Sequence, residues 1–270
     1  MFDFLKGFSP FQLALIGGCF AWGVTSLGAA VVFLFKKIDR NVLNGLLGFS
    51  AGVMIAAAIW SLIIPAIDLS KEMKMVAWVP PAIGIITGMV VLFIIDKILP
   101  HLHQGLPQSK SEGIKTAWQK NMLLFSAITL HNIPEGLVIG VAFGSLNYST
   151  THLTIATAAA LALGIALQDF PEGIAASVPL RGGGWSKWKC FFYGQLSGMV
   201  EPIGALIGYW FVTVSRQILP FALSFAAGAM LFVVIEELIP ESQQEGNTDI
   251  STIFTIIGFV VMMILDVALS

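Results

Sequence analysis

Long apolar segments follow one another through almost the whole chain. Eight of them have about the length that a helix needs to cross a bilayer, roughly 20 residues, and they lie at about 11–35, 43–66, 76–99, 118–144, 153–179, 188–214, 217–240 and 251–269. Backbone groups inside a membrane must bond within their own segment, so we expect helices. The alternating ten-residue strands of a membrane barrel are absent from the sequence. The prediction is an all-α integral membrane protein with one transmembrane domain over residues 1–270.

The composition supports this prediction. Of the 270 residues, 56% are hydrophobic and 11% are charged, whereas soluble domains carry about 25% charged residues. The net charge of -2 offers no basic surface for nucleic acid. The first apolar segment continues for about 25 residues without a cleavage site, so we interpret it as a membrane helix rather than a removed signal peptide.

The basic residues predict an orientation. Ten lysines and arginines fall in the connections on one side of the predicted membrane and four on the other. Because lysine and arginine accumulate on the cytoplasmic side, we expect both termini to lie outside the cytoplasm.

Short sequence matches suggest an internal repeat. FSAGVM (49–54) returns as FAAGAM (225–230), and VTSLGA (24–29) returns as VEPIGA (200–205), both at an offset of 176 residues. An odd number of predicted spans between the copies makes them run in opposite directions. We therefore expect an inverted repeat of helices 1–3 and 6–8 around a central helix 4–5 pair, an arrangement typical of transporters.

The central pair carries two related motifs, HNIPEG (131–136) and QDFPEG (168–173). Residues four apart share one face of a helix, so His131 and Glu135 project together, as do Gln168 and Glu172. Each motif also contains a proline, whose missing N–H leaves a main-chain carbonyl without its helical donor.

Carboxylates accumulate at this depth. Asn132 and Asp169 lie one position further along each helix, and Glu201 stands beside Pro202 in the sixth segment. Glu135, Asp169, Glu172 and Glu201 would together cost roughly 10 kcal/mol as unpaired anions within a membrane. No lysine or arginine is predicted at this depth, so protons or bound cations are expected to neutralise them.

The side-chain types narrow the choice of cation. Imidazole suits zinc, iron, copper and nickel, while carboxylates alone suit magnesium, calcium and manganese. His131 together with carboxylates, and Met54 as a weaker thioether candidate, favour Zn²⁺ or a similar transition metal over Mg²⁺ or Ca²⁺. Further polar residues are candidates to line a transport route on either side of this site: Ser61, Asp68 and Asp266 on the outer side, and His101, His103, Glu236 and Glu237 on the cytoplasmic side.

With these motifs the chain resembles the ZIP (Zrt/Irt-like) metal transporter family, in particular its prokaryotic GufA-like branch. The resemblance implies a binuclear site at the membrane midplane, with Glu135, Glu172 or Glu201 able to bridge. One metal would be held by Met54, His131, Glu135, Gln168 and Glu172, and the other by Asn132, Asp169 and Glu201. QDFPEG replaces the histidine-rich fifth-helix motif of many eukaryotic members, so metal preference stays open among Zn²⁺, Cd²⁺, Fe²⁺ and Mn²⁺.

The resemblance also implies a homodimer in the prokaryotic cytoplasmic membrane and metal import into the cytoplasm by alternating access, with no organic cofactor. Three alternatives remain at the level of sequence. A proton or alkaline-earth-cation carrier could use the carboxylates alone. An intramembrane metallohydrolase could use the same ligands, although HNIPE is not the HExxH pattern. A haem-binding electron carrier would need more deep axial ligands than His131.

Overall fold

The computed structural model describes residues 3–35, 37–102, 108–148, 154–182, 184–243 and 248–269, and within them the chain is helical, without strands. His103, a predicted route residue, lies outside the described residues. The elements are η1 (Asp3–Gly7), α1 (Pro10–Ala30), η2 (Val31–Phe33), α2 (Arg40–Ala57), η3 (Ala58–Ile63), α3 (Ile64–Glu72), α4 (Val79–Ile98), η4 (Gln108–Lys110), α5 (Lys120–Ser145), α6 (Ile155–Gly182), α7 (Lys187–Gly198), α8 (Val200–Thr213), η5 (Arg216–Ile218), α9 (Leu219–Val233), η6 (Val234–Leu238), α10 (Ile239–Ser242) and α11 (Thr248–Leu269).

Six described helical stretches are long and apolar enough to cross a membrane. They are Pro10–Phe33, Arg40–Glu72, Val79–Ile98, Lys120–Ser145, Arg216–Ser242 and Thr248–Leu269. The other two predicted segments, 153–179 and 188–214, fall on α6 and on the consecutive helices α7 and α8. The protein is therefore an all-helical membrane protein. The helix bounds differ from the predicted ones chiefly in the second span, which continues to Glu72.

Three helices change their winding next to prolines. The span that we expected as one helix over 188–214 is interrupted at Met199, because Pro202 has no N–H to donate to the carbonyl of Gly198. η3 and η6 are π-helical turns, and α3 and α10 then begin with a proline in the first turn. The π-helical turns begin at Ala58 and Val234, which are 176 positions apart, the same offset as the two sequence matches.

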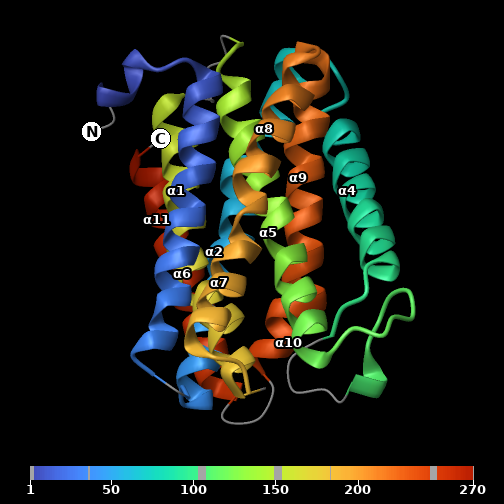
Figure 1. Ribbon diagram of the computed structural model, residues 1–270. Helices are drawn as coiled ribbons and strands as arrows, with labels where there is room; N and C mark the ends of the chain where they lie inside the picture. Colours follow the sequence, from blue (N-terminus) through green and yellow to red (C-terminus); the bar gives the residue numbers. More distant parts are fainter. Residues whose placement is uncertain are drawn as a thin grey trace.

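The helices pack as two groups. In one group α1 packs on α6, α7 and α8, and α5 packs on α8; in the other, α2 packs on α11 and α4 on α9. Figure 1 shows α4 at one edge of the bundle beside α9, and it shows η1 and the end of α11 at the same end of the bundle. The groups meet where α2 packs on α6 and α5 on α9, so the motif-bearing helices α5 and α6 lie at the junction.

Small residues allow the closest of these contacts. Gly136, Gly140 and Gly144 follow one face of α5 at four-residue spacing, and a side chain on any of them would meet α8. Such small-residue stripes let membrane helices approach closely. Gly136 packs directly on the main chain of Glu201, so this contact sets the position of that carboxylate relative to α5.

Candidate metal centre

The motifs of α5 and α6 face each other inside the bundle. His131, Asn132 and Glu135 on α5 and Gln168, Asp169 and Glu172 on α6 are all buried, none of them more than 3% exposed. The side-chain amide of Gln168 donates a hydrogen bond to Glu135 across the two helices. The structure thus brings the two motifs together at one place.

Three carboxylates from three helices converge here. One carboxylate oxygen from each of Glu135, Asp169 and Glu201 lies within 4.8 Å of the other two. Glu201 reaches the cluster from the first turn of α8, where the positive end of the helix dipole favours an anion. Asn132 Nδ2 donates to Glu201 Oε1 over 3.2 Å. We call Glu135, Asp169 and Glu201 the carboxylate cluster.

Several side-chain carboxylate and amide oxygens at this site accept no hydrogen bond from the described residues. Among the described residues, no partner reaches the second oxygen of each cluster carboxylate, either oxygen of Glu172, or the amide oxygens of Asn132 and Gln168. No described lysine or arginine forms an ion pair with any of these residues. Buried anions without donors or counter-charges are strongly unfavourable, and unshared carboxylate and amide oxygens are the groups that coordinate a divalent cation.

His131 has a partner that the sequence did not pair with it. Its Nε2 lies 2.7 Å from Oε2 of Glu237, in the π-helical turn η6, and both side chains are 4% exposed. Glu237 and its neighbour Glu236 point to different sides of η6, because Glu237 is buried and Glu236 is exposed on the surface of the bundle. Of the two glutamates predicted for the route, Glu237 therefore lies inside the protein and next to the motif on α5.

Met54 approaches the site from α2. Ser50, one turn earlier on the same helix, donates to the main-chain carbonyl of Gln168 over 3.1 Å, which sets α2 against α6 at the level of the motif. Met54 is four residues further along, on the same face, and is 1% exposed. Its sulfur is thus in the interior, one helical turn beyond the Ser50 contact.

Thr25 is a site residue that the motifs do not reveal. Its hydroxyl donates to Glu201 Oε1 over 2.8 Å and is fully buried. A signal for it is present in the sequence, because VTSLGA and VEPIGA align Thr25 with Glu201. That match indicates a repeat, but it does not by itself indicate that the two aligned residues touch.

The predicted outer residues surround a cavity of about 210 Å³. Ser61 donates a hydrogen bond to Asp266, which is 6% exposed. Asp68 lies further out and forms an ion pair with Lys71 over 2.8 Å. Trp60 and Thr157 complete the polar and aromatic part of the wall. The cavity lies towards the end of the bundle that holds the termini, since α11 ends there (Figure 1).

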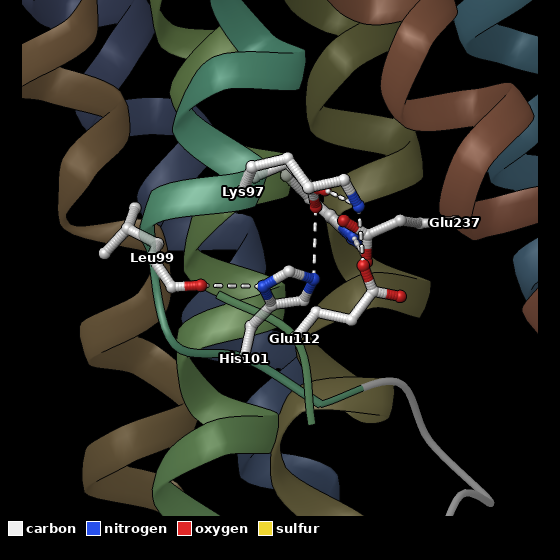
Figure 2. A network of polar contacts seen from close by, with 7 residues as sticks. Lys97, Leu99, His101, Glu112 and Glu237 are labelled. Carbon is white, nitrogen blue, oxygen red and sulfur yellow. Dashed lines mark hydrogen bonds and ion pairs between the residues drawn. The ribbon is translucent and has the colours of Figure 1, made fainter. Parts of the chain in front are cut away.

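A second polar cluster lies at the opposite end, where the chain leaves α4. His101 Nε2 is 3.1 Å from Asp96 Oδ1, its Nδ1 is 2.8 Å from the carbonyl of Leu99, and Lys97 Nζ is 2.7 Å from Glu112 Oε2. Figure 2 shows Glu237 beside this network. Glu237 thus stands between His131 and His101.

The protonation of His101 follows from these neighbours. Burial of His101 alone would lower its pKa, but the nearby carboxylate of Asp96, the contact with the carbonyl of Leu99 and the charge of Glu237 outweigh burial and raise the pKa above its usual value. A protonated His101 is therefore favoured while the network is intact.

Buried carboxylates without a lysine or arginine partner, at the junction of two helix groups in an all-helical membrane bundle, are typical of proteins that move cations across a membrane.

The comparisons with known proteins agree with this class. The family model described as "ZIP Zinc transporter" matches residues 108–266. The chain is 37% identical to zinc transporter ZIP11 of Homo sapiens, over 98% of this chain and 100% of that protein. It is 34% identical to zinc transporter GufA of Myxococcus xanthus, over 95% and 98%, and 35% identical to zinc transporter ZIPB of Bordetella bronchiseptica, over 95% and 81%. The chain belongs to the ZIP family, which confirms the predicted resemblance.

Proposed function

We propose that the chain transports divalent transition metals, with Zn²⁺ as the main substrate, through a site formed by the α5 and α6 motifs and Glu201. The family match and the named zinc transporters support Zn²⁺ as the substrate. The observation that carries the proposal for the site is the carboxylate cluster, whose three oxygens lie within 4.8 Å of one another and form no ion pair with a lysine or arginine in the described part of the chain.

The ligands are proposed to divide between two positions. One metal is held by Met54, His131, Glu135, Gln168 and Glu172. The other is held by Asn132, Asp169 and Glu201, with Glu135, Glu172 or Glu201 as the bridge. The proximity of Glu135 to Asp169 and Glu201 supports Glu135 in the bridging role. The ion pair between His131 and Glu237 implies that His131 exchanges Glu237 for the metal.

The route is proposed to run the length of the bundle. A metal enters by Asp68, Ser61 and Asp266, crosses the site, and leaves past Glu237 and His101. We propose eight spans with the inverted repeat, because the two π-helical turns repeat at the 176-residue offset. We propose that the protein is a homodimer in a prokaryotic inner membrane, with its termini outside the cytoplasm. It imports metal into the cytoplasm by alternating access.

The alternative functions, a hydrolase, an electron carrier and a carrier of protons or alkaline-earth cations, are less well supported than this proposal. The relatives are named transporters rather than hydrolases or electron carriers, so the protein is a transporter and not an enzyme. A carrier for protons or alkaline-earth cations would not need His131. The carboxylate cluster alone, however, is also suited to harder cations, so the test must compare metals.

Flux into proteoliposomes tests the proposal. We expect purified protein to admit Zn²⁺ and Cd²⁺, with Fe²⁺ and Mn²⁺ competing and Mg²⁺ competing weakly. Asp169→Asn and His131→Ala should each reduce Zn²⁺ flux by about tenfold or more, because each removes a ligand that no neighbouring group replaces. Glu72→Gln, on the surface beside Arg216, serves as a matched control and should retain flux. Zinc flux that survives both site changes would reject the site, and uptake of Mg²⁺ alone would reject the metal class.

A further inference from the structure

A group of basic and aromatic side chains lies where α6 ends and α7 begins, against η2. We call Arg181, Lys187, Lys189, Trp185 and Trp188 the α7 basic patch. Both α6 and α7 contact η2 here. The patch lies at the end of the bundle opposite the termini, because α1 runs from the end with the termini down to η2 (Figure 1).

The two lysines are held over aromatic rings. Lys189 Nζ lies 3.9 Å from the ring centroid of Trp185, and Lys187 Nζ lies 5.8 Å from that of Phe33. The ring of Trp188 packs edge-on against Phe33 at 4.7 Å. Both ammonium groups are thereby held against aromatic rings rather than extending freely into water.

Within the described residues, no carboxylate pairs with the basic groups of this patch. Lys71, Lys97 and Arg216 elsewhere each have an acidic partner, at 2.8, 2.7 and 3.6 Å. Arg181 instead donates to the main-chain carbonyl of Val32 over 2.7 Å. The charge of the patch is therefore available to an anion from outside the chain.

The surroundings indicate which kind of anion. Trp188 is 67% exposed, and next to η2 Leu34 and Phe35 are 78% and 54% exposed. A soluble anion would account for the cations but not for these apolar side chains beside them. Tryptophan and lysine side chains grouped beside an apolar surface are typical of the boundary between lipid headgroups and acyl chains.

The start of α7 adds main-chain donors. Ser186 caps the helix by accepting from the N–H of Lys189, which leaves other first-turn N–H groups without helical acceptors. Such a terminus favours a phosphate, and both lysines belong to its first turn.

We propose that the α7 basic patch binds the phosphate of an anionic phospholipid, such as phosphatidylglycerol, in the leaflet at this end of the bundle. The lipid phosphate lies against Lys187, Lys189 and the start of α7, and its acyl chains lie along Trp188 and Leu34. The lipid joins the ends of α1, α6 and α7. The proposal depends on the membrane location and not on the transported ion.

Lipid binding can be measured on purified, delipidated full-length protein by thermal unfolding and native mass spectrometry. The variant is Lys187→Gln with Lys189→Gln. The control is Lys115→Gln with Lys120→Gln, which removes the same charge from exposed positions at the same end of the bundle. Each sample receives nanodiscs of phosphatidylcholine alone or with phosphatidylglycerol.

We expect phosphatidylglycerol to raise the thermal midpoint of the wild type and of the control. In the patch variant the lipid should bind roughly 30-fold more weakly, because each basic residue near an anionic surface contributes about fivefold. Equal lipid binding by the patch variant and the control would overturn the proposal. So would an equal stabilisation by soluble glycerol phosphate, which would indicate a site for a free anion. A normal thermal midpoint of the patch variant in phosphatidylcholine establishes that it is folded.

Discussion

Thr25 and Glu201 form a buried hydrogen bond between α1 and α8, with the hydroxyl 2.8 Å from Glu201 Oε1. They are also 176 positions apart, the offset of the sequence matches and of the two π-helical turns. The same oxygen accepts from Asn132 Nδ2, which leaves Oε2 of Glu201 without a partner in the described structure. Two donors therefore fix one oxygen of Glu201 and leave the other without a hydrogen bond.

Replacing Thr25 by valine should weaken zinc binding and flux. The change removes a hydrogen bond to a charged group, which contributes about 1.5–3 kcal/mol, so we expect roughly a tenfold loss. Thr25→Ser keeps the hydroxyl and should restore most of the activity. Thr87→Val is the control, since Thr87 is exposed and bonds only within α4. Zinc flux into proteoliposomes is the measurement, and equal flux for valine and serine at position 25 would contradict this role.

Much of the fold was accessible from the sequence because hydrophobic length dominates inside a membrane. The apolar segments predicted the helices, although the second span was too short by several residues and the sixth was predicted without its break at Met199. The break depends on Pro202 and the local packing of α8. Neither the proline nor the packing changes the apolar composition of the segment, so the break at Met199 does not appear as a change in hydropathy.

The site was predictable only in part. The HxxxE spacing placed His131 and Glu135 on one face, and the same rule applied to Gln168 and Glu172. It could not reveal that Glu237 reaches His131, because the contact joins helices that are far apart in the sequence and Glu237 lies in the π-helical turn η6. Spacing rules assume 3.6 residues per turn, and a single widened turn is enough to move a side chain from the surface to the interior.

Neutralising one member of the carboxylate cluster should change stability in opposite directions with and without metal. Glu135→Gln removes charge from a site crowded with anions, so in a chelator the variant should unfold at a higher temperature than the wild type. The wild type should gain stability on adding zinc, by about 2.7 kcal/mol at 100 times its dissociation constant, and the variant should gain much less. Thermal unfolding in detergent measures both effects. A variant that gains as much from zinc as the wild type would argue against Glu135 as a ligand.

Glu237 and Glu236 provide a matched pair in η6. Glu237→Gln removes the charged partner of buried His131, and a broken buried ion pair is costly, so we expect zinc flux to fall by about tenfold or more. Glu236 is exposed, and Glu236→Gln should stay within about twofold of the wild type, because exposed charges contribute little. Initial rates of zinc uptake at several zinc concentrations will separate binding from turnover. The assignment fails if both variants lose flux equally.

The raised pKa of His101 predicts that its contribution to the free energy of unfolding depends on pH. Its pKa is raised in the folded protein, so the stabilisation by Asp96 is fully present below about pH 6.5, the ordinary histidine pKa. It is lost as the pH rises through the higher folded pKa. The difference in thermal midpoint between the wild type and His101→Gln should therefore be largest in mildly acidic buffer and narrow as the pH rises. Unfolding with a chelator present isolates this effect from metal binding, and a difference that stays constant with pH would refute it.

The contact between α1 and α6 offers a test of how closely the site depends on helix packing. A methyl group added to Gly28 would lie 3.1 Å from Cα of Gly173 and would collide with the main-chain carbonyl of Phe170. Gly28→Ala must therefore push α6 away, at a cost of about 1–3 kcal/mol, and should displace Asp169 with it. We expect a lower thermal midpoint and reduced zinc flux. Gly23→Ala on the same helix meets no atom within 4 Å and should be neutral or stabilising by up to about 1 kcal/mol. If both alanine variants carry zinc at the wild-type rate, the position of the α6 motif does not depend on this contact.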